Sequence, residues 1–428
     1  METKFDVVVV GAGPAGASAA YTAARHGLKV LLVERGRGAG SKQVFGGRVY
    51  AAPLREIYED FDKEAPIHRW VRKERVSLVH GDRMVTFEYE SDRTVSFTTY
   101  LTQLTSWMVE KAVDAGAIFV DEVRVDSILR NDAGKVVGVE SGSERVYADI
   151  VVDAEGVNRL LLEKLGLVEK TRPSQVALGV KEVVKVGEDK INERFGVAPG
   201  EGVSWVLTGD VSGNMPGGAF IYTNKDTVSI GVVVYLESAV NMVKEPIHIL
   251  VEKLRTHPSL KRLWADGDVM EYAARLTPES GYRYMPRKLA THGLMVAGDA
   301  AGLLLNTGYT FRGVDYAALS GYMAGNAAVK ALEEGDTGEE NLRRLYEKPL
   351  LESFIVRDLK RHRGIEWLMS NPEFFKKYPA LATGVACRLF DLEDEAPTVY
   401  EALRSSASDQ GLSLLRLVLD MFRVVRKL

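Results

Sequence analysis

The hydrophobic pattern at the start of the chain predicts a buried strand, a tight turn and a helix. Residues 5–10 read Phe-Asp-Val-Val-Val-Val, and an unbroken run of β-branched residues is typical of a central parallel strand. A G-x-G-x-x-G turn follows at once, with Pro14 where the first turn of a helix tolerates a missing N–H. A second apolar run, residues 29–33, ends in Glu34. This order predicts a dinucleotide-binding βαβ unit.

Each residue of the turn has a physical role in that prediction. Gly11 allows the tight turn, Gly13 allows the backbone to approach a pyrophosphate, and Gly16 allows the helix to pack against the strand. The free N–H groups and the dipole of the helix N-terminus then favour the anion. Glu34 has the spacing expected of the carboxylate that binds a ribose hydroxyl. These residues alone are compatible with NAD or FAD, and their N-terminal position favours a resident FAD.

The pattern further along the chain predicts a mixture of strands and helices. We expect extended structure over 74–99, a helix over 100–115, a β-meander over 117–153, a strand-rich segment over 171–285 and helices over 341–428. Within the first of these helices, Gln103 points away from the apolar face. It either hydrogen-bonds a cofactor or is an ordinary exposed glutamine.

Three other glycine-containing segments are candidates for contact with the cofactor. The basic loop 35–48 contains Gly46 and Gly47, and is either a cofactor-binding loop or a mobile surface loop. The strand ending at residue 152 runs into Asp153-Ala154-Glu155-Gly156, where backbone can approach a ligand at the carboxyl end of a strand. A late buried strand leads to Gly298-Asp299, whose aspartate either caps a helix or accepts a hydrogen bond from a cofactor hydroxyl.

Composition narrows the classes of function. The 428 residues predict two or three domains, and a net charge of −4 gives no general attraction to nucleic acid. The single cysteine, Cys387, excludes both an intramolecular disulfide and an iron–sulfur cluster ligated by cysteines of this chain alone. The 7 histidines are scattered, and neither a nucleophile triad nor a metal-ligand set stands out. We therefore predict no metal and no catalytic side chain, and place the chemistry on a cofactor.

The last helical pattern bears on localisation. Ser413, Arg416, Asp420, Arg423 and Lys427 recur at spacings of three and four, and the positions between them are largely apolar. Such a basic amphipathic helix either lies on a membrane surface or packs on its own domain. No apolar run is long enough to span a bilayer, and the first strand begins without a preceding signal segment. We expect a cytoplasmic protein with peripheral contact to the inner face of the cell membrane.

Taken together, the first glycine turn, the Asp-Ala-Glu-Gly turn and Gly298-Asp299-Ala300 resemble the glutathione-reductase-type FAD fold in its hydroxylase-like branch. Residues 217–224, the Gly308-to-Gly313 loop and residues 371–379 resemble more narrowly the FixC and electron-transfer-flavoprotein:quinone oxidoreductase family. The resemblance implies a Rossmann-like α/β FAD-binding domain interrupted in sequence, a β-rich quinone domain and a helical C-terminal region. The expected FAD-binding domain comprises 1–73, 100–170 and 286–340, the quinone domain 74–99 and 171–285, and the helical region 341–428.

The resemblance also implies site residues. The late aspartate of the family contacts the ribityl chain of FAD, and its glycine pair, here Gly217 and Gly218, lies at the quinone headgroup. The expected FAD-binding residues are Gly11, Gly13, Pro14, Ala15, Gly16, Glu34, Arg35, Gly46, Gly47, Gln103, Val123, Asp153, Ala154, Gly156, Gly298, Asp299, Gly308 and Gly313.

The function implied is electron transfer from an electron-transfer flavoprotein, with its alpha and beta subunits, to a membrane quinone. Mitochondrial-type members carry a cysteine-ligated [4Fe–4S] cluster, so the single cysteine here predicts a separate ferredoxin-like [4Fe–4S] partner. Some such complexes bifurcate electrons from NADH. The alternatives are a geranylgeranyl reductase, a flavin-dependent monooxygenase and a flavin-stabilised scaffold without turnover.

Overall fold

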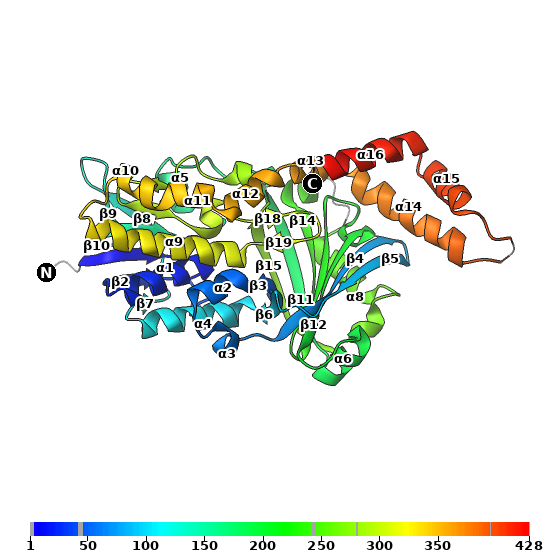
Figure 1. The fold of residues 1–428 in the computed structure, drawn as a ribbon, viewed down its shortest axis with the longest axis horizontal. Coiled ribbons are helices and arrows are strands. Elements are labelled where there is room, and N and C mark those ends of the chain that lie inside the picture. Colours follow the sequence, from blue (N-terminus) through cyan, green and yellow to red (C-terminus); the bar gives the residue numbers. More distant parts are fainter. Residues whose placement is uncertain (1–3, 42–45, 242–244, 280, 394, 428) are drawn as a thin grey trace.

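The computed structural model describes residues 4–41, 46–241, 245–279, 281–393 and 395–427. Two sheets lie one after the other along the long axis of the molecule, and a group of C-terminal helices projects beyond the second sheet (Figure 1). The mixed α/β fold with a Rossmann-type first sheet, a curled second sheet and C-terminal helices confirms the predicted fold class.

The first sheet is the dinucleotide-binding sheet. From one edge to the other its main strands are β16 (Ala290–Thr291), β17 (Leu294–Val296), β10 (Glu144–Asp153), β1 (Lys4–Val10), β2 (Val30–Val33) and β7 (Ile118–Val120). The five strands from β17 to β7 are parallel, and β8 (Ser127–Arg130) and β9 (Val136–Ser141) add an antiparallel extension to β10. Because parallel strands share a carboxyl edge, the segments that follow them meet there.

One predicted element of this sheet is wrong in part. The β-meander expected over 117–153 is present for β8, β9 and β10, but β7 pairs in parallel with β2. The reason is the helix α4 (Leu101–Asp114), which precedes β7 and provides the crossover that a parallel strand requires.

Two helices rich in small residues cross on one face of this sheet. The first is α1 (Pro14–Arg25), and the second is α9 (Val314–Glu333), which lies against it although some 300 residues separate them (Figure 1). A Cβ at Gly321 would lie 1.9 Å from the carbonyl oxygen of Ala15, and one at Gly325 would lie 2.8 Å from that of Ala19. Only glycine permits this close crossing. The crossing buries the alanines of both helices in one hydrophobic cluster, to which α4 contributes Met108.

The second sheet is curled and mostly antiparallel. Its strand order is β15 (Asp268–Pro278), β11 (Val176–Lys185), β14 (Thr227–Tyr235), β13 (Gly217–Thr223), β12 (Glu201–Gly209), β4 (Arg69–His80), β6 (Ser96–Tyr100) and β3 (Gly46–Tyr50), with β5 (Arg83–Glu90) paired to β4. The strand-rich segment predicted over 171–285 is present, and within it β13 and β14 form an antiparallel hairpin. The predicted domain boundaries stay a prediction. They place β3 in the FAD-binding domain, whereas β3 pairs with β6 in the second sheet.

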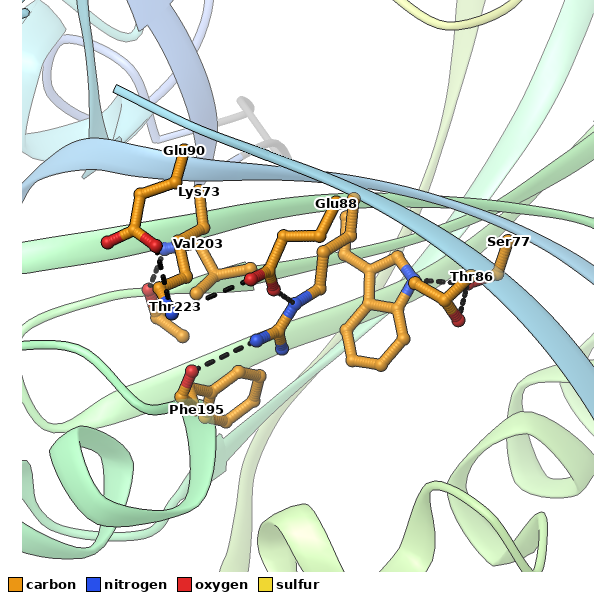
Figure 2. A network of polar contacts seen from close by, with 10 residues as sticks. Lys73, Ser77, Thr86, Glu88, Glu90, Phe195, Val203 and Thr223 are labelled. Atoms are coloured by element: carbon orange, nitrogen blue, oxygen red, sulfur yellow. Dashed lines mark hydrogen bonds and ion pairs between the residues drawn. The ribbon is translucent and has the colours of Figure 1, made fainter.

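The parallel β12–β4 pair joins the two halves of the curled sheet and is fastened by side chains. Figure 2 shows this network, in which Trp205 Nε1 donates to Ser77 Oγ at 2.7 Å. Arg75 lies over the Trp205 ring, 4.9 Å from its centroid, and its guanidinium donates to Glu88 on β5. Lys73 pairs with the same carboxylate at 3.6 Å. The junction therefore combines ring packing with ion pairs on one face.

The remaining elements cover the sheets or extend the molecule. Those beside the sheets are α2 (Ala52–Ile57), α3 (Phe61–Glu64), α5 (Leu160–Lys164), α6 (Glu188–Phe195), α7 (Leu236–Asn241), α8 (Ile247–Thr256), α10 (Glu339–Leu342), α11 (Lys348–Glu352), α12 (Phe354–Arg361) and the short pair β18 (Leu305–Asn306) and β19 (Phe311–Arg312). The terminal group is α13 (Ile365–Met369), α14 (Glu373–Phe390), α15 (Val399–Asp409) and α16 (Leu414–Lys427). α14 and α15 form a projecting hairpin, and α16 returns along it towards α13 (Figure 1).

Candidate functional site

A single cavity of about 1010 Å³ extends from the first sheet, along the second sheet, to the C-terminal helices. We divide its wall into three sections. The nucleotide section is formed by Gly11, Ala12, Gly13, Pro14, Ala15, Glu34, Arg35, Val123, Ala154, Glu155, Gly156 and Lys164. The sheet section is formed by Gly47, Arg48, Leu207, Gly217, Gly218, Tyr222, Tyr235, Arg275, Thr277, Glu279, Asp299, Asn306, Gly308, Arg312 and Gly313. The helical section is formed by Leu368, Met369, Phe374, Phe375, Tyr378, Asp420, Met421, Val424 and Val425.

The glycine turn after β1 begins the nucleotide section. Gly11 has φ +95°, and a Cβ there would lie 2.4 Å from the carbonyl oxygen of Ala154. A Cβ at Gly16 would lie 1.8 Å from the carbonyl oxygen of Gly11, so that glycine lets the helix close on the turn. Gly13 is the N-cap of α1 and no side chain caps the helix. The first-turn N–H groups are therefore available to an anion in the cavity.

The carboxylate of Glu34 is held at the end of β2 by backbone donors. The N–H of Ala12 donates to Oε2 at 3.0 Å, and the N–H of Gly36 donates to Oε1 at 2.6 Å. These bonds fix the carboxylate on the cavity wall beside the glycine turn. A carboxylate has about four lone-pair sites, so it retains capacity to accept from a ribose hydroxyl. The arrangement fits the nucleotide half of a dinucleotide cofactor.

The turn after β10 contains two carboxyls with different functions. Asp153 is fully buried, and its Oδ1 accepts from the N–H of Glu155 at 3.0 Å. Burial, followed by the nearby Glu155 charge, raises the Asp153 pKa well above its ordinary value. Glu155 instead caps α5, because its Oε1 accepts from the N–H groups of Leu161 and Leu162 at 2.9 and 3.0 Å. The carboxyls thus support the turn, and Ala154 and Gly156 present backbone to the cavity.

The turn after β17 places a carboxyl between two arginines. Burial raises the pKa of Asp299, and the positive charges of Arg275 and Arg159 act in the opposite direction. Arg159 lies over the Tyr284 ring, 3.3 Å from its centroid, and burial lowers its pKa to about 10. Within the described part of the chain, Nε and Nη2 of Arg159 have no hydrogen-bond partner. Arg159 does not itself line the cavity, but Asp299, whose charge it influences, does.

Two further arginines line the sheet section. Arg48 on β3 pairs with Glu74 and lies over Tyr50, 4.8 Å from the ring centroid. Arg312 on β19 donates to Oδ2 of Asp315 at 2.6 Å and also lies over Tyr50 at 4.6 Å. Each cation therefore has a carboxylate and an aromatic partner that hold it in one position. The two guanidinium groups on this part of the wall could interact with an electron-rich ring or an anion.

The glycine pair of β13 lies on the wall because neighbouring strands approach it closely. Gly217 has φ +139°, and a Cβ there would lie 2.1 Å from the carbonyl oxygen of Val233. A Cβ at Gly218 would lie 2.5 Å from the carbonyl oxygen of Leu207. Both residues are therefore restricted to glycine by the sheet itself, and both leave backbone open to the cavity.

The helical section is apolar and aromatic. Phe374 stacks on Tyr378 with ring centroids 4.9 Å apart, and Trp367 packs edge-on against Phe374 at 5.3 Å. The Tyr378 hydroxyl donates to Oδ2 of Asp420 at 2.7 Å, which joins α14 to α16. The apolar side chains of Val424 and Met421 complete this end of the wall. The cavity can therefore accommodate an apolar ligand beside its polar nucleotide end.

Two known families match successive parts of this chain. The family described as FAD dependent oxidoreductase matches residues 6–162, and the family described as ETF-QO, ubiquinone-binding matches residues 176–277. The probable electron transfer flavoprotein-quinone oxidoreductase YdiS of Escherichia coli K12 is 37% identical over 397 residues, which cover 92% of each chain. Protein FixC of Escherichia coli O157:H7 is 36% identical over 401 residues, with the same coverage of 92%. The chain belongs to the FixC family of electron transfer flavoprotein-quinone oxidoreductases.

Solved structures agree with the fold of this FixC-family chain. A geranylgeranyl bacteriochlorophyll reductase-like protein from Thermoplasma acidophilum has a TM-score of 0.73 over 99% of this chain and all of that chain, at 19% identity. The flavin-dependent brominase Bmp2 has a TM-score of 0.62 over 96% of this chain and 99% of that chain, also at 19% identity. At such identities the likeness establishes the fold alone.

FAD is the cofactor of this FixC-family protein, as predicted, and the enzyme is an FAD-dependent oxidoreductase. The residues present fit it: uncapped helix N–H groups, a fixed ribose-side carboxylate and buried arginine nitrogens without partners all lie on or beside one cavity. Within the described residues, no three histidine, cysteine or carboxylate side chains gather as a metal site would require. None of the described helices is both long and apolar enough to cross a membrane.

The structure brings most of the predicted FAD-binding residues to the cavity wall, but not all. The predicted residues on the wall are Gly11, Gly13, Pro14, Ala15, Glu34, Arg35, Gly47, Val123, Ala154, Gly156, Asp299, Gly308 and Gly313. Gly16, Asp153 and Gly298 are buried directly behind it, where they shape the turns. Gly46 begins β3.

Gln103 is directed away from this cavity. It lies on α4 beside a separate shallow hollow, and its Oε1 is 2.7 Å from Nε2 of His68. The wall also contains residues that the sequence analysis did not select, namely Arg48, Tyr235, Arg275, Glu279 and Arg312. Arg312 had a sequence signal, because it lies between Gly308 and Gly313 in a segment typical of the family. The others come from strands whose pairing only the structure shows.

Proposed function

We propose that this chain accepts electrons from an electron-transfer flavoprotein and passes them through its FAD to a membrane quinone. The observation that carries the proposal is the single cavity, which joins a dinucleotide-binding end to an apolar helical end. The bound FAD would supply the redox chemistry. The predicted FAD-binding residues on the cavity wall would hold that cofactor, and Gly217 and Gly218 would offer backbone to the quinone headgroup.

The chain's own residues would position the two reactants. The N-terminus of α1 and Glu34 would hold the nucleotide end, while Asp299 would accept from a hydroxyl of the cofactor chain. Phe374 and Tyr378 would enclose an apolar quinone in the helical section. Placing both ligands in one cavity shortens the path for electrons between them.

The proposed membrane contact is α16. Asp420 is buried and fixes the helix, because it accepts from Tyr378 and pairs with Arg416 at 3.4 Å and Arg423 at 3.3 Å. The opposite side of the helix exposes the apolar side chains of Leu415, Val418, Leu419, Phe422 and Val425, each 48–75% exposed. An exposed apolar stripe flanked by arginines suits a membrane surface. It lies beside the helical section, where a membrane quinone would enter.

We further propose that the protein acts in a complex with a ferredoxin-like [4Fe–4S] subunit and with the alpha and beta subunits of the flavoprotein. This rests on Cys387 being the only cysteine, since a cluster of that kind needs about four thiolate ligands. An assembly that bifurcates electrons from NADH is one form that such a complex takes.

Purification of the native complex followed by anaerobic reduction tests the proposal. We expect a [4Fe–4S] subunit to accompany the chain, the flavin to be reduced by the electron-transfer flavoprotein, and a quinone analogue to reoxidise it. Absence of the iron–sulfur subunit would contradict the complex. Failure of the quinone analogue to reoxidise the flavin, with isoprenoid double bonds saturated instead, would favour a geranylgeranyl reductase.

A charge introduced in the helical section should weaken the binding of a quinone with an isoprenoid tail more than that of a quinone without a tail. In detergent, Val424→Glu is expected to raise KM for an isoprenoid quinone about tenfold, equivalent to ~1.4 kcal/mol, because the tail would meet a carboxylate. The KM for a tail-less quinone should change much less. Val418→Glu is the matched control, since Val418 is on the same helix, is 57% exposed and does not line the cavity. Equal increases for both quinones would contradict this route for the tail.

A further inference from the structure

The sheet section contains a buried carboxyl that the proposed electron path does not use. Glu279 directly follows β15, is 4% exposed and lines the cavity. Arg275 and Thr277 line the same cavity from alternate positions of that strand. Since side chains alternate along a strand, Arg275, Thr277 and Glu279 lie on the side of β15 that faces the cavity.

Three hydrogen bonds fix Glu279 in place. Its Oε2 accepts from Nδ2 of Asn306 on β18 at 2.8 Å. Its backbone oxygen accepts from the Tyr235 hydroxyl at 3.3 Å, and its N–H donates to the carbonyl oxygen of Gln175 at 2.9 Å. The carboxyl is therefore held at the cavity by partners drawn from several elements.

The burial of this carboxyl favours its protonated form. Burial raises the Glu279 pKa to about 7, and the Asn306 hydrogen bond acts in the opposite direction. In the described part of the chain no charged side chain contributes to that shift. The charged groups nearby are Arg275 on the same strand and, on α13, Glu366, which pairs with Arg283 at 2.9 Å. A buried acid of this kind can give up and regain a proton near neutral pH.

Strand register places this acid at the same end of the sheet as the glycine pair. Tyr235 is opposite Ala177, which is opposite Thr277, so one row crosses β14, β11 and β15. The neighbouring residue of β14, Val234, is opposite Gly217 of β13. From the other side the helical section closes over this end. A quinone held there would contact the backbone of Gly217 and Gly218. Glu279 would lie on the same wall of the cavity.

We propose that Glu279 donates a proton to a carbonyl oxygen of the quinone as the quinone is reduced. This inference rests on the proposed function. The quinone gains two electrons, which arrive through the FAD from the electron-transfer flavoprotein, and two protons. One proton leaves the Glu279 carboxyl as a new O–H bond forms on the quinone, and water entering the cavity supplies the other. The resulting carboxylate is then reprotonated by solvent.

Glu279→Gln tests the proposal in the complete complex. Glutamine keeps the shape and can still accept from Asn306, but it has no acid proton. Single-turnover reoxidation of the reduced enzyme by a quinone analogue should slow about a hundredfold near pH 7. In the wild type this rate should fall as pH rises through about 7, and in Glu279→Gln that dependence should be absent. Reduction by the electron-transfer flavoprotein should be unchanged in both.

The pH dependence of thermal stability is a second test, and it does not require the enzyme to turn over. The wild-type folded state binds its proton more tightly than the unfolded state, so stability should fall as pH rises from about 4.5 to about 7. Glutamine does not titrate, so the Tm advantage of Glu279→Gln should grow over that window, by on the order of 3 °C, and then level off. A Tm difference that does not change with pH would overturn the protonation assignment.

Glu366→Gln is the control for loss of a carboxyl near this end of the sheet, because Glu366 does not line the cavity. It should reoxidise at the wild-type rate. A wild-type rate and pH profile in Glu279→Gln, or equal slowing in both variants, would overturn the role of Glu279. A wild type that no quinone reoxidises would instead overturn the proposed function, and this inference with it.

Discussion

Gly11→Ala is expected to yield protein that retains no stoichiometric FAD. The added methyl group would lie 2.4 Å from the carbonyl oxygen of Ala154, which is backbone and cannot rotate away. The turn after β1 or the turn after β10 must therefore move, and both belong to the nucleotide section. Flavin content after gel filtration, measured from the visible absorbance per chain, checks this result.

Gly116→Ala is the matched control for Gly11→Ala. Gly116 has φ +103°, close to the +95° of Gly11, so alanine suffers a similar backbone strain of about 1–2 kcal/mol at either position. A Cβ at Gly116 meets no atom within 4 Å. The control should lose some stability and keep its FAD. If both variants keep their flavin, the close approach of the two turns is not needed for cofactor binding.

The second large effect is expected at the membrane. Replacing Phe422 and Val425 together with serine should weaken binding to anionic liposomes about a hundredfold. These side chains are 64% and 75% exposed on α16, and burial of each in an apolar layer contributes ~1.5 kcal/mol or more. Cosedimentation with vesicles of defined composition measures the change.

Val240 and Met270, at 70% and 62% exposure, provide the comparison for the α16 variant. Their joint replacement by serine removes a similar apolar area from other elements of the chain, α7 and β15. Liposome binding should then be unchanged. An equal loss in the two double variants would mean that general surface hydrophobicity, and not α16, carries the attachment.

Much of the nucleotide section could be predicted from sequence because of one geometric rule. β1, β2, β10 and β17 are parallel and end together, with Val10 opposite both Val33 and Asp153, and Asp153 opposite Val296. The residues that follow such strands must therefore meet. Local glycine patterns marked each strand end, so segments near residues 11, 154 and 299 could be assigned to one site before any contact was known.

The remainder of the wall depends on pairings between distant segments. Arg48 lies on β3, and Arg275 and Glu279 lie more than 220 residues later on or after β15, the opposite end of the curled sheet. Local sequence does not show that these two strands, at opposite edges of the sheet, contribute to one site. Only the curl of the sheet brings them to one cavity.

Gln103 and α16 illustrate two further limits. A polar residue off an apolar helical face can point to a ligand or elsewhere, and Gln103 bonds His68. On α16 the spacing left open which side packs on the protein, and in the structure Asp420 turns inward to Tyr378 while apolar side chains on the other side are exposed. A buried hydrogen bond decided the orientation, and amphipathic spacing alone gives no sign of it.

The crossing of α1 and α9 has a consequence for biosynthesis. The first glycine turn is synthesised well before the helix that covers α1 and the strand β17 beside β10, both of which follow only after residue 290. Until then the small-residue face of α1 has no partner, and the sheet lacks part of its parallel core. Contacts of such long sequence separation form slowly and late. We therefore expect FAD to be acquired only after most of the polypeptide has been translated.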